Sequence, residues 1–334
     1  PAVTRIEDVA RCPWASFVTR RLDVAPMPDP QLGLPDPTGR LVGEVVHRVL
    51  EQIVGDGLGE AIKGDLSEIG SRPGNAVPWP RTARLEAILE SVSRQVAEEA
   101  GLAPLGLATL LAARSRPYLD VARRMDWGED GRLDSVLATE VEGRVQLEGI
   151  GHPLRFRADR VDRASDGLRL VDYKTGKPAS VAQGAGTRRK HLLAEVAKGR
   201  KLQAAAYALA GKDGSATGCY LWLRPDIGDV KEESRIGIVR GDDPDFASAL
   251  TEAVDAVASA LEVGTMFPRV EEVGSDKAPE NCKYCPVAEA CRRDDSAFRR
   301  RLVAWMETPD SGEELVDGAA RRLWHLGVKK REES

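Results

Sequence analysis

The spacing of apolar residues predicts a helical first part of the chain. Apolar positions recur there every three or four residues, which is the period of a helix with one buried face. The clearest helix spans residues 39–54, and its apolar stripe consists of Leu41, Val42, Val45, Val46, Val49, Leu50 and Ile53. The same pattern predicts helices at residues 4–22, 81–100 and 104–125. Thr4 and Glu7 have the spacing of a capping box for the first of these.

Strands are predicted further along the chain, where the apolar period changes to two. They lie at residues 136–148, 154–163, 168–173, 217–223 and 235–239. Helices are predicted at residues 188–210, 244–263 and 292–306, with a weakly amphipathic tail at 312–328. A proline-rich break at 26–37 and a loop with a short helical piece at 55–80 separate the early helices. This order predicts an α/β protein of the α+β type, with a mixed central sheet flanked by helices.

The hairpin formed by the second and third predicted strands carries candidate chemistry. Side chains two residues apart in a strand share a face, so Asp172 and Lys174 project from the same side. Asp159 of the partner strand can join them if the register allows. Carboxylates hold hard divalent cations, and a lysine can orient or help to deprotonate a water molecule. This motif alone does not separate a hydrolytic metal site from a surface ion pair on an ordinary hairpin.

Composition narrows the class of protein. The 334 residues are 42% hydrophobic and 30% charged, which is typical of a globular protein with one large or two ordinary domains. No apolar run approaches the roughly 20 residues of a membrane span and no secretory signal is visible, so we expect a cytoplasmic protein without a membrane partner. The chain begins at Pro1 rather than methionine, which suggests a domain cut from a larger protein.

Positive charge is clustered along the chain although the net charge is −5. Such clusters can follow a phosphate backbone, but they are also common on solvated faces. The clusters are Arg155, Arg157, Arg160 and Arg163; Arg188, Arg189 and Lys190; Lys198, Arg200 and Lys201; and Arg292, Arg293, Arg299, Arg300 and Arg301. The charge pattern therefore permits nucleic-acid binding without establishing it.

The five cysteines suggest metal ligation rather than disulfides. An odd number of cysteines without a signal peptide indicates a reducing compartment. Cys282, Cys285 and Cys291 form a C-x2-C-x5-C cluster, whereas a zinc site or an iron–sulfur cluster normally needs four ligands. Cys219 lies within an apolar predicted strand and is interpreted as a core residue.

Four short motifs occur in an order that resembles one family of enzymes. They are Gly43-x3-His47, Asp159 in the second predicted strand, Asp172-Tyr173-Lys174 in the third, and Gln203-x3-Tyr207 in the helix that follows. This order resembles the PD-(D/E)XK nucleases, and most of all the nuclease domain of the AddAB and RecBCD helicase–nucleases. That family usually has a glycine before the aspartate, from which Arg155-Phe-Arg-Ala-Asp159 departs, while the spacing is otherwise kept.

The resemblance implies a restriction-endonuclease-like fold and a role for each motif residue. The implied ligands of Mg²⁺ or Mn²⁺ are His47, Asp159, Asp172 and the backbone carbonyl of Tyr173. The implied catalytic residues are Asp159, Asp172, Lys174, Gln203 and Tyr207. Weaker candidates are Glu140 beside the site and, as phosphate contacts, Thr175, Lys177 and the basic cluster that starts at Arg188. Taken singly, His47 would be a core residue, and Gln203 with Tyr207 a polar patch on a helix.

The resemblance also accounts for the cysteines. One branch of the family has one cysteine before the G-x3-H helix and three after the Q-x3-Y helix, as do Cys12, Cys282, Cys285 and Cys291 here. It implies an iron–sulfur cluster of the 4Fe-4S type that joins the N- and C-terminal segments, with zinc as the alternative. The nuclease domain would span residues 1–310, followed by a charged C-terminal tail at 311–334 that can be helical.

The function that the resemblance implies is that of a metal-dependent DNA exonuclease. It would act on single strands or duplex ends in double-strand-break processing and recombinational repair, with a helicase subunit or an upstream helicase domain as partner. Three alternatives stay open: a catalytically silent DNA-end binding module, a standalone CRISPR-adaptation-type nuclease, and an iron–sulfur redox protein.

Overall fold

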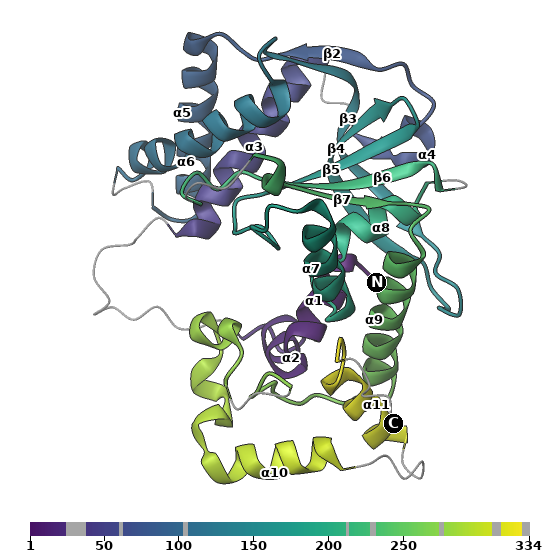
Figure 1. Cartoon of the computed structure of the whole chain (residues 1–334). Coiled ribbons are helices and arrows are strands. Elements are labelled where there is room, and N and C mark those ends of the chain that lie inside the picture. The colour runs from purple at the N-terminus through teal and green to yellow at the C-terminus, as the bar shows by residue number, and fades with distance from the viewer. Residues whose placement is uncertain are drawn as a thin grey trace.

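A mixed sheet forms the centre of the computed structural model (Figure 1). The structure describes residues 1–24, 38–59, 63–102, 106–211, 214–227, 232–273, 277–308 and 315–328. The described strands follow the order β1-β3-β4-β5-β6-β7, and β2 pairs with β3. They are β1 (Gly64–Asp65), β2 (Asn75–Pro78), β3 (Arg132–Val145), β4 (Leu154–Ala164), β5 (Gly167–Lys174), β6 (Ala216–Trp222) and β7 (Ile236–Arg240).

Strand directions confirm the predicted mixed sheet. β3, β4 and β5 are antiparallel neighbours, β5 and β6 run parallel, and β6 and β7 are antiparallel. The predicted strands correspond to β3 through β7, with ends that differ by a few residues. β1 and β2 lie in the segment predicted as a loop with a short helical piece, which is α4 (Leu66–Ile69). Both strands are too short for an apolar period to reveal them.

Helices cover both faces of the sheet (Figure 1). The helices are α1 (Val3–Arg11), α2 (Pro13–Arg20), α3 (Gly39–Leu58), α4 (Leu66–Ile69), α5 (Thr82–Glu99), α6 (Ala108–Ala122), α7 (Ala185–Ala197), α8 (Gln203–Leu209), α9 (Pro244–Glu262), α10 (Ser296–Glu307) and α11 (Leu315–Trp324). α3, α5 and α6 share a buried core with Val171 and Leu221. α1, α8, α9 and α11 share a second core with Leu170 and Tyr220. Neighbouring residues of β5 thus enter different cores, as strand alternation requires.

The predicted helix at 4–22 is two helices in the structure, which corrects that prediction. Cys12 has extended angles (φ −165°, ψ 105°) and separates α1 from α2. The ring of Pro13 disfavours a helical conformation at the residue before it, which explains the break. The capping-box prediction is also wrong, because Ala2 rather than Thr4 is the N-cap residue of α1 and no side chain caps it.

The predicted helix at 188–210 is also two helices, α7 and α8. Gly199 (φ 71°) and Lys201 (φ 52°) hold left-handed angles in the connection, which ends one helix and redirects the next. The apolar period continues across this break, so the sequence pattern hides it. Gln203 is therefore the first residue of a new helix.

The other predicted helices have shifted ends. α3 is about one turn longer than predicted. The helix predicted at 292–306 begins at Ser296, because Asp295 is its N-cap residue and its side chain accepts hydrogen bonds from the first turn. α6 begins at Ala108 and is followed by a π-helix, η2 (Arg123–Trp127). The predicted break at 26–37 and the predicted helix start at 104 lie outside the described residues.

The C-terminal tail carries α11, which packs against α9. Its Trp324 is buried in the core that α9 shares with the sheet. The division of the chain at residue 310 stays a prediction. Of the helices described, none combines the length and the apolar character needed to cross a bilayer.

Candidate active site

The residues of the predicted hydrolytic motif meet where β4 and β5 separate. The pairing of these strands ends at Arg160 and Val171, while β5 continues to pair with β6 as far as Lys174. Asp159 and Asp172 come directly after the last β4–β5 pair, so both carboxylates stand at the opening between the strands. The register therefore allows Asp159 to join Asp172 and Lys174.

Asp172 and Lys174 are linked by polar contacts to Gln203 and Tyr207 of α8. The Lys174 ammonium lies 2.7 Å from Asp172 Oδ2 and donates a 2.6 Å hydrogen bond to Gln203 Oε1. The amide of Gln203 donates to the Tyr207 hydroxyl at 3.3 Å. That hydroxyl lies 3.2 Å from Asp172 Oδ1 and 2.7 Å from the carbonyl oxygen of Arg157. Gln203 and Tyr207 thus face the carboxylate and hold the lysine in place.

Asp159 is held by a backbone amide and by the histidine of α3. Its Oδ2 accepts a 2.7 Å hydrogen bond from the Tyr173 N–H and lies 3.3 Å from His47 Nδ1. Burial disfavours both charged forms, but the contact between the two side chains, together with the Tyr173 amide and Lys174 at Asp159 and the charge of Asp172 at His47, outweighs it. The pKa of His47 therefore lies above its usual value and the pKa of Asp159 below. His47 is a partner of Asp159 rather than an isolated core residue.

The pKa of Asp172 shifts in the opposite direction from that of Asp159. Burial raises the pKa of Asp172; Lys174 offsets only part of this effect, and Asp159 adds to it. Burial opposes the charge of Lys174, but its contacts with Asp172 and the nearby charges of Asp159 and Glu7 together outweigh burial and raise its pKa. Asp172 Oδ2 is buried and, apart from its ion pair with Lys174, makes no hydrogen bond. This oxygen keeps the capacity to bind a cation.

Gly43 explains how α3 brings His47 to the site. A Cβ atom at this position would lie 2.9 Å from Oγ1 of Thr175, which follows β5 directly. That separation is shorter than ordinary packing allows, so glycine lets the helix approach the end of the strand. About one turn later, His47 reaches Asp159. Thr175, a candidate phosphate contact, packs against α3 in this structure.

A family comparison covers most of the chain. The family model of the PD-(D/E)XK nuclease superfamily matches residues 2–292. The chain belongs to the PD-(D/E)XK nuclease superfamily. The match runs from α1 to just beyond Cys291, so it includes every motif of the sequence prediction. A comparison with curated proteins finds no match.

Membership of the PD-(D/E)XK superfamily indicates a nuclease that binds DNA, and its members generally use Mg²⁺ or Mn²⁺. Mg²⁺ usually binds through one or two carboxylates and completes its shell with water and substrate phosphate. Asp159, Asp172 and the carbonyl of Tyr173 supply hard oxygen donors of that kind. Within the described ranges, no three or more His, Cys, Asp and Glu side chains form a ready metal site. Asp159 and Asp172 supply two carboxylates, one fewer than the three side chains of such a group.

Glu7 of α1 lies at the site and was missed by sequence reasoning. Its carboxylate accepts a 2.6 Å hydrogen bond from the N–H of Leu202, the residue before α8. Burial raises its pKa, and the charges of Lys174 and Asp172 also act on it. Its spacing from Thr4 pointed to a helix cap, so the one available sequence signal indicated another role.

Glu140 of β3 borders the site. Its side chain pairs with Arg157 at 2.8 Å, and burial together with Asp159 raises its pKa. It holds a left-handed backbone angle (φ 50°), which marks a local distortion opposite Asp159 in the β3–β4 register. The charge of Glu140 is therefore engaged by Arg157 rather than free for chemistry.

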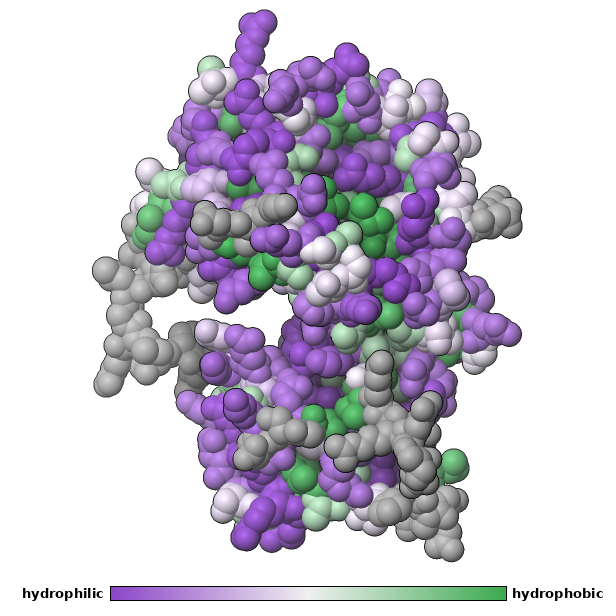
Figure 2. Space-filling model, in the orientation of Figure 1, coloured by the Kyte–Doolittle hydropathy of each residue, from purple (hydrophilic) through white to green (hydrophobic). Residues whose placement is uncertain are grey.

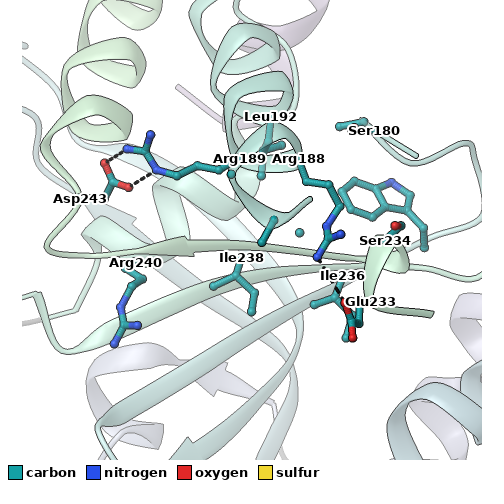
Figure 3. A pocket seen from close by; sticks show the side chains of 15 residues that line it. Ser180, Arg188, Arg189, Leu192, Glu233, Ser234, Ile236, Ile238, Arg240 and Asp243 are labelled. Atoms are coloured by element: carbon teal, nitrogen blue, oxygen red, sulfur yellow. Dashed lines mark hydrogen bonds and ion pairs between the residues drawn. The ribbon is translucent and has the colours of Figure 1, made fainter. Parts of the chain in front are cut away.

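The arginines predicted as phosphate contacts have structural partners. Figure 3 shows Arg189 pointing to Asp243, to which it donates hydrogen bonds of 2.9 and 2.7 Å. Arg188 donates to the carbonyl oxygens of Ala182 and Gln183. Both arginines line a cavity of about 590 Å³ between α7 and β7. Arg188 therefore holds the segment between β5 and α7, and Arg189 holds the start of α9.

The other basic candidates differ in how far their side chains are exposed to solvent. Lys177 and Lys190 are exposed and can meet a phosphate. Arg160 of β4 is fully buried between Asp126 and Asp162, so the expectation that its cluster follows a phosphate backbone is wrong for this residue.

The fold gathers the four cysteines from both ends of the matched segment. Cys12 lies between α1 and α2, and the Arg269 N–H meets its sulfur at 3.5 Å. Cys282 Sγ lies 3.7 Å from the carbonyl oxygen of Arg269. Burial raises the pKa of Cys282, and charges on Cys12, Cys285 and Cys291 raise it further. Four free thiols fit iron–sulfur or zinc chemistry by donor type, although the described thiols are not arranged as a ready metal site.

Proposed function

We propose that this chain is a metal-dependent DNA exonuclease domain. The observation that carries the proposal is the meeting of Asp159, Asp172 and Lys174 where β4 and β5 separate. When bound there, Mg²⁺ or Mn²⁺ would neutralise charge on the scissile phosphate and lower the pKa of an attacking water. Asp159, Asp172 and the Tyr173 carbonyl would hold the ion, with His47 as a further ligand.

Lys174 is placed to act on the phosphate or on the water. Its ammonium is tied to Asp172 and Gln203, but its side chain is 31% exposed and can meet a substrate. A fixed cation beside the scissile phosphate stabilises the charge that develops there. Gln203 and Tyr207 would keep Lys174 and Asp172 in position rather than react themselves.

The shape of the molecule supports a DNA substrate. Figure 2 shows a hollow between the part that carries α3 and α6 and the part that carries α2 and α10, with largely hydrophilic residues along it. Figure 1 places α1 and α7 beside this hollow. α3 carries His47 and α1 carries Glu7, so the elements at the hollow also carry site residues. We infer that the strand to be cut enters from this side.

The order of the motifs supports a proposal for the biological role. Gly43-x3-His47, Asp159, Asp172-Tyr173-Lys174 and Gln203-x3-Tyr207 resemble the helicase–nucleases most of all. The domain would degrade strands at a double-strand break during recombinational repair. A helicase subunit or helicase domain would supply the unwound strand.

Cleavage of linear DNA tests the nuclease proposal. With Mg²⁺, end-labelled linear DNA should yield short labelled products, whereas closed circular DNA should survive. Asp172→Ala and Lys174→Ala should abolish these products. Variants that cut as well as the wild type would refute the site, and loss of circular DNA would indicate an endonuclease. Binding of DNA ends without any cleavage would favour the silent end-binding module.

We further propose that Cys12, Cys282, Cys285 and Cys291 hold a structural 4Fe-4S cluster. Support comes from the four thiols that the fold gathers from distant parts of the sequence. A shared cluster would close a loop of most of the chain and so restrict the unfolded state. It would connect Cys12, between α1 and α2, with the segment before α10 that carries the other three cysteines.

Metal content tests the cluster. An anaerobic preparation should be brown and contain iron, and Cys12→Ser should lose that iron and unfold at a lower urea concentration. Cys219→Ser is the matched control, because Cys219 is 1% exposed within β6 and should leave the iron content unchanged. A colourless protein with zinc would indicate the alternative metal. A protein with neither metal would refute the cluster.

A further inference from the structure

A second ionic cluster lies on the other face of β5 from Asp172 and Lys174. Arg160 is fully buried and donates to Asp162 through Nε at 2.7 Å and through Nη2 at 2.8 Å. The same Nη2 lies 3.1 Å from Oδ1 of Asp126. The guanidinium is therefore enclosed by two carboxylates.

Asp126 connects this cluster to Tyr173. The Tyr173 hydroxyl donates a 2.8 Å hydrogen bond to Asp126 Oδ2 and also contacts the Arg160 guanidinium. Asp126 lies in the π-helix η2, a rare geometry that is frequent at functional sites. The next residue, Trp127, anchors η2 through a 3.1 Å hydrogen bond from its indole N–H to the carbonyl oxygen of Val77. The Asp126 side chain is thus held on a fixed element.

Tyr173 belongs to the site through its backbone and its ring. Its N–H donates to Asp159 Oδ2 at 2.7 Å, and its carbonyl is the proposed third contact of the ion. Its ring meets the His47 imidazole edge to face, with centroids 6.5 Å apart and planes at 82°. A movement of Tyr173 would therefore displace the support of both Asp159 and His47.

We propose that Asp126 is a positioning residue for the nuclease centre. By holding the Tyr173 hydroxyl, Asp126 fixes β5 at Tyr173 and so aims the N–H that orients Asp159. Among the described residues Asp126 contacts Arg160, Tyr173 and Arg169, so it would act on the site through Tyr173. The inference rests on the proposed function, since it needs Asp159 to be a metal ligand.

Neutralising Arg160 does not require Asp126. Asp162 already makes two hydrogen bonds to the buried guanidinium, so one carboxylate would balance its charge. Burial opposes the charge of Asp126, but Arg160 and also Arg169, 4.0 Å away, favour it, so the pKa of Asp126 lies below its usual value. What Asp126 adds is an acceptor for the Tyr173 hydroxyl, a hydrogen bond that Asp162 does not make among the described contacts.

Three substitutions test this inference. Asp126→Asn and Asp162→Asn each remove one carboxylate charge beside Arg160, but only Asp126→Asn weakens the contact with Tyr173. Tyr173→Phe removes the hydroxyl and leaves the ring, the backbone and the charges in place. For each variant, the unfolding midpoint, kcat and the Mg²⁺ concentration for half-maximal cleavage are measured. Mn²⁺ binding is followed by electron paramagnetic resonance, which requires no cleavage.

The two kinds of variant should differ in their metal requirement. Asp126→Asn and Tyr173→Phe should raise the half-saturating Mg²⁺ concentration by up to about 10-fold, the lower end of the cost of losing a group that orients a metal ligand directly, because both variants keep the Tyr173 N–H. Mn²⁺ binding should weaken in parallel. Asp162→Asn should lower the unfolding midpoint but leave the Mg²⁺ requirement unchanged.

The possible outcomes separate this inference from the proposed function. The inference is overturned if Asp162→Asn shifts the Mg²⁺ requirement as much as Asp126→Asn does, or if Tyr173→Phe leaves it unchanged. If Asp126→Asn does not fold, Tyr173→Phe decides by itself. A wild-type protein that neither cleaves DNA nor binds Mn²⁺ would refute the proposed function, and the inference with it.

Discussion

Two ionic clusters lie on opposite faces of β5, and they differ in what they leave unpaired. Arg160 is enclosed by Asp126 and Asp162, with 1% of its side chain exposed. Lys174 keeps 31% of its side chain exposed, and the only polar partner of Asp172 Oδ2 among the described residues is Lys174, at 2.7 Å. We call Arg160, Asp126 and Asp162 the closed cluster, in which a basic residue and two carboxylates stabilise the fold. We call Lys174, Asp172 and Asp159 the open cluster, in which a basic residue and two carboxylates can still accept a cation and a phosphate.

The largest effect is expected for Asp172→Asn, which should lower the cleavage rate without lowering the stability. Asp172→Asn keeps the size of the side chain but removes the charge that a metal needs. Cleavage should fall at least about 1,000-fold, or about 4 kcal/mol of transition-state stabilisation. Because burial and Asp159 disfavour the charge on Asp172, the free energy of unfolding should stay equal or rise. Single-turnover cleavage and urea unfolding measure the two quantities.

The control for Asp172→Asn is Asp166→Asn in the exposed turn between β4 and β5. Asp166 is 61% exposed and lies 3.5 Å from Arg240, so its loss should change neither quantity appreciably. Full activity of Asp172→Asn, or a marked loss of its stability, would contradict the description of the open cluster.

Arg160→Met should have the largest effect on folding. It leaves Asp126 and Asp162 buried without their partner. Removal of one member of a buried ionic cluster lowers the free energy of unfolding by about 3–5 kcal/mol. Urea unfolding monitored by circular dichroism measures the loss.

Arg157→Met is the matched control on the same strand. Arg157 pairs with Glu140 at 2.8 Å, but its side chain is 67% exposed. Because Glu140 is only 15% exposed, this pair should contribute more than an exposed pair but less than an enclosed one, so the loss should stay below about 3 kcal/mol. Equal losses from Arg160→Met and Arg157→Met would mean that enclosure adds nothing to the closed cluster.

The open cluster could be predicted from the sequence because its signals are local. Strand alternation places Asp172 and Lys174 on one face, and the order of the motifs adds His47 and Gln203 as a family resemblance. The mixed sheet follows from the change of apolar period between the early helices and the later strands. These predictions need no knowledge of contacts between distant residues.

The closed cluster could not be predicted, because only its Arg160–Asp162 contact is local and its other contacts join distant residues. Asp126 meets Arg160 across 34 residues, from a π-helix that has no periodic signature in the sequence. Glu7 meets Leu202 across 195 residues, and its spacing within α1 pointed elsewhere. Breaks such as the one at Lys201 are hidden for a related reason, since they change direction without changing the apolar period.

Gly218→Ala should disturb the open cluster through packing alone. A Cβ atom at Gly218 of β6 would lie 1.8 Å from the carbonyl oxygen of Ala204 in α8. The helix that carries Gln203 must then shift, so Lys174 loses part of its support and cleavage should fall as well. Overpacking of this kind lowers the free energy of unfolding by about 1–3 kcal/mol. Thermal unfolding and cleavage rate measure both effects.

Gly186→Ala in α7 is the control for that substitution. A Cβ atom at Gly186 meets nothing within 4 Å, and alanine favours a helix over glycine by up to about 1 kcal/mol. This variant should be as stable as the wild type or slightly more so. A Gly218→Ala protein with wild-type stability and activity would show that α8 can move without affecting the open cluster.

Glu7→Gln should have the smallest effect, and its sign depends on pH. The amide can still accept the hydrogen bond from Leu202, while the charge is lost. Burial raises the pKa of Glu7 above its usual 4.5, so the folded protein binds this proton more tightly than the unfolded chain does. The stability that the proton contributes is complete below pH 4.5 and is lost as the pH rises through the folded pKa.

Above its folded pKa the wild type must hold a buried negative charge at Glu7, and Glu7→Gln should then be slightly more stable. Below pH 4.5 the two proteins should unfold at the same urea concentration, because Glu7 is then protonated in both the folded and the unfolded state. Urea unfolding in the two pH ranges checks this crossover. A variant less stable than the wild type above the folded pKa would mean that the attraction of Lys174 outweighs burial. Glu7 would then share the charge of Lys174 with Asp172, and Lys174 would be less available to a phosphate.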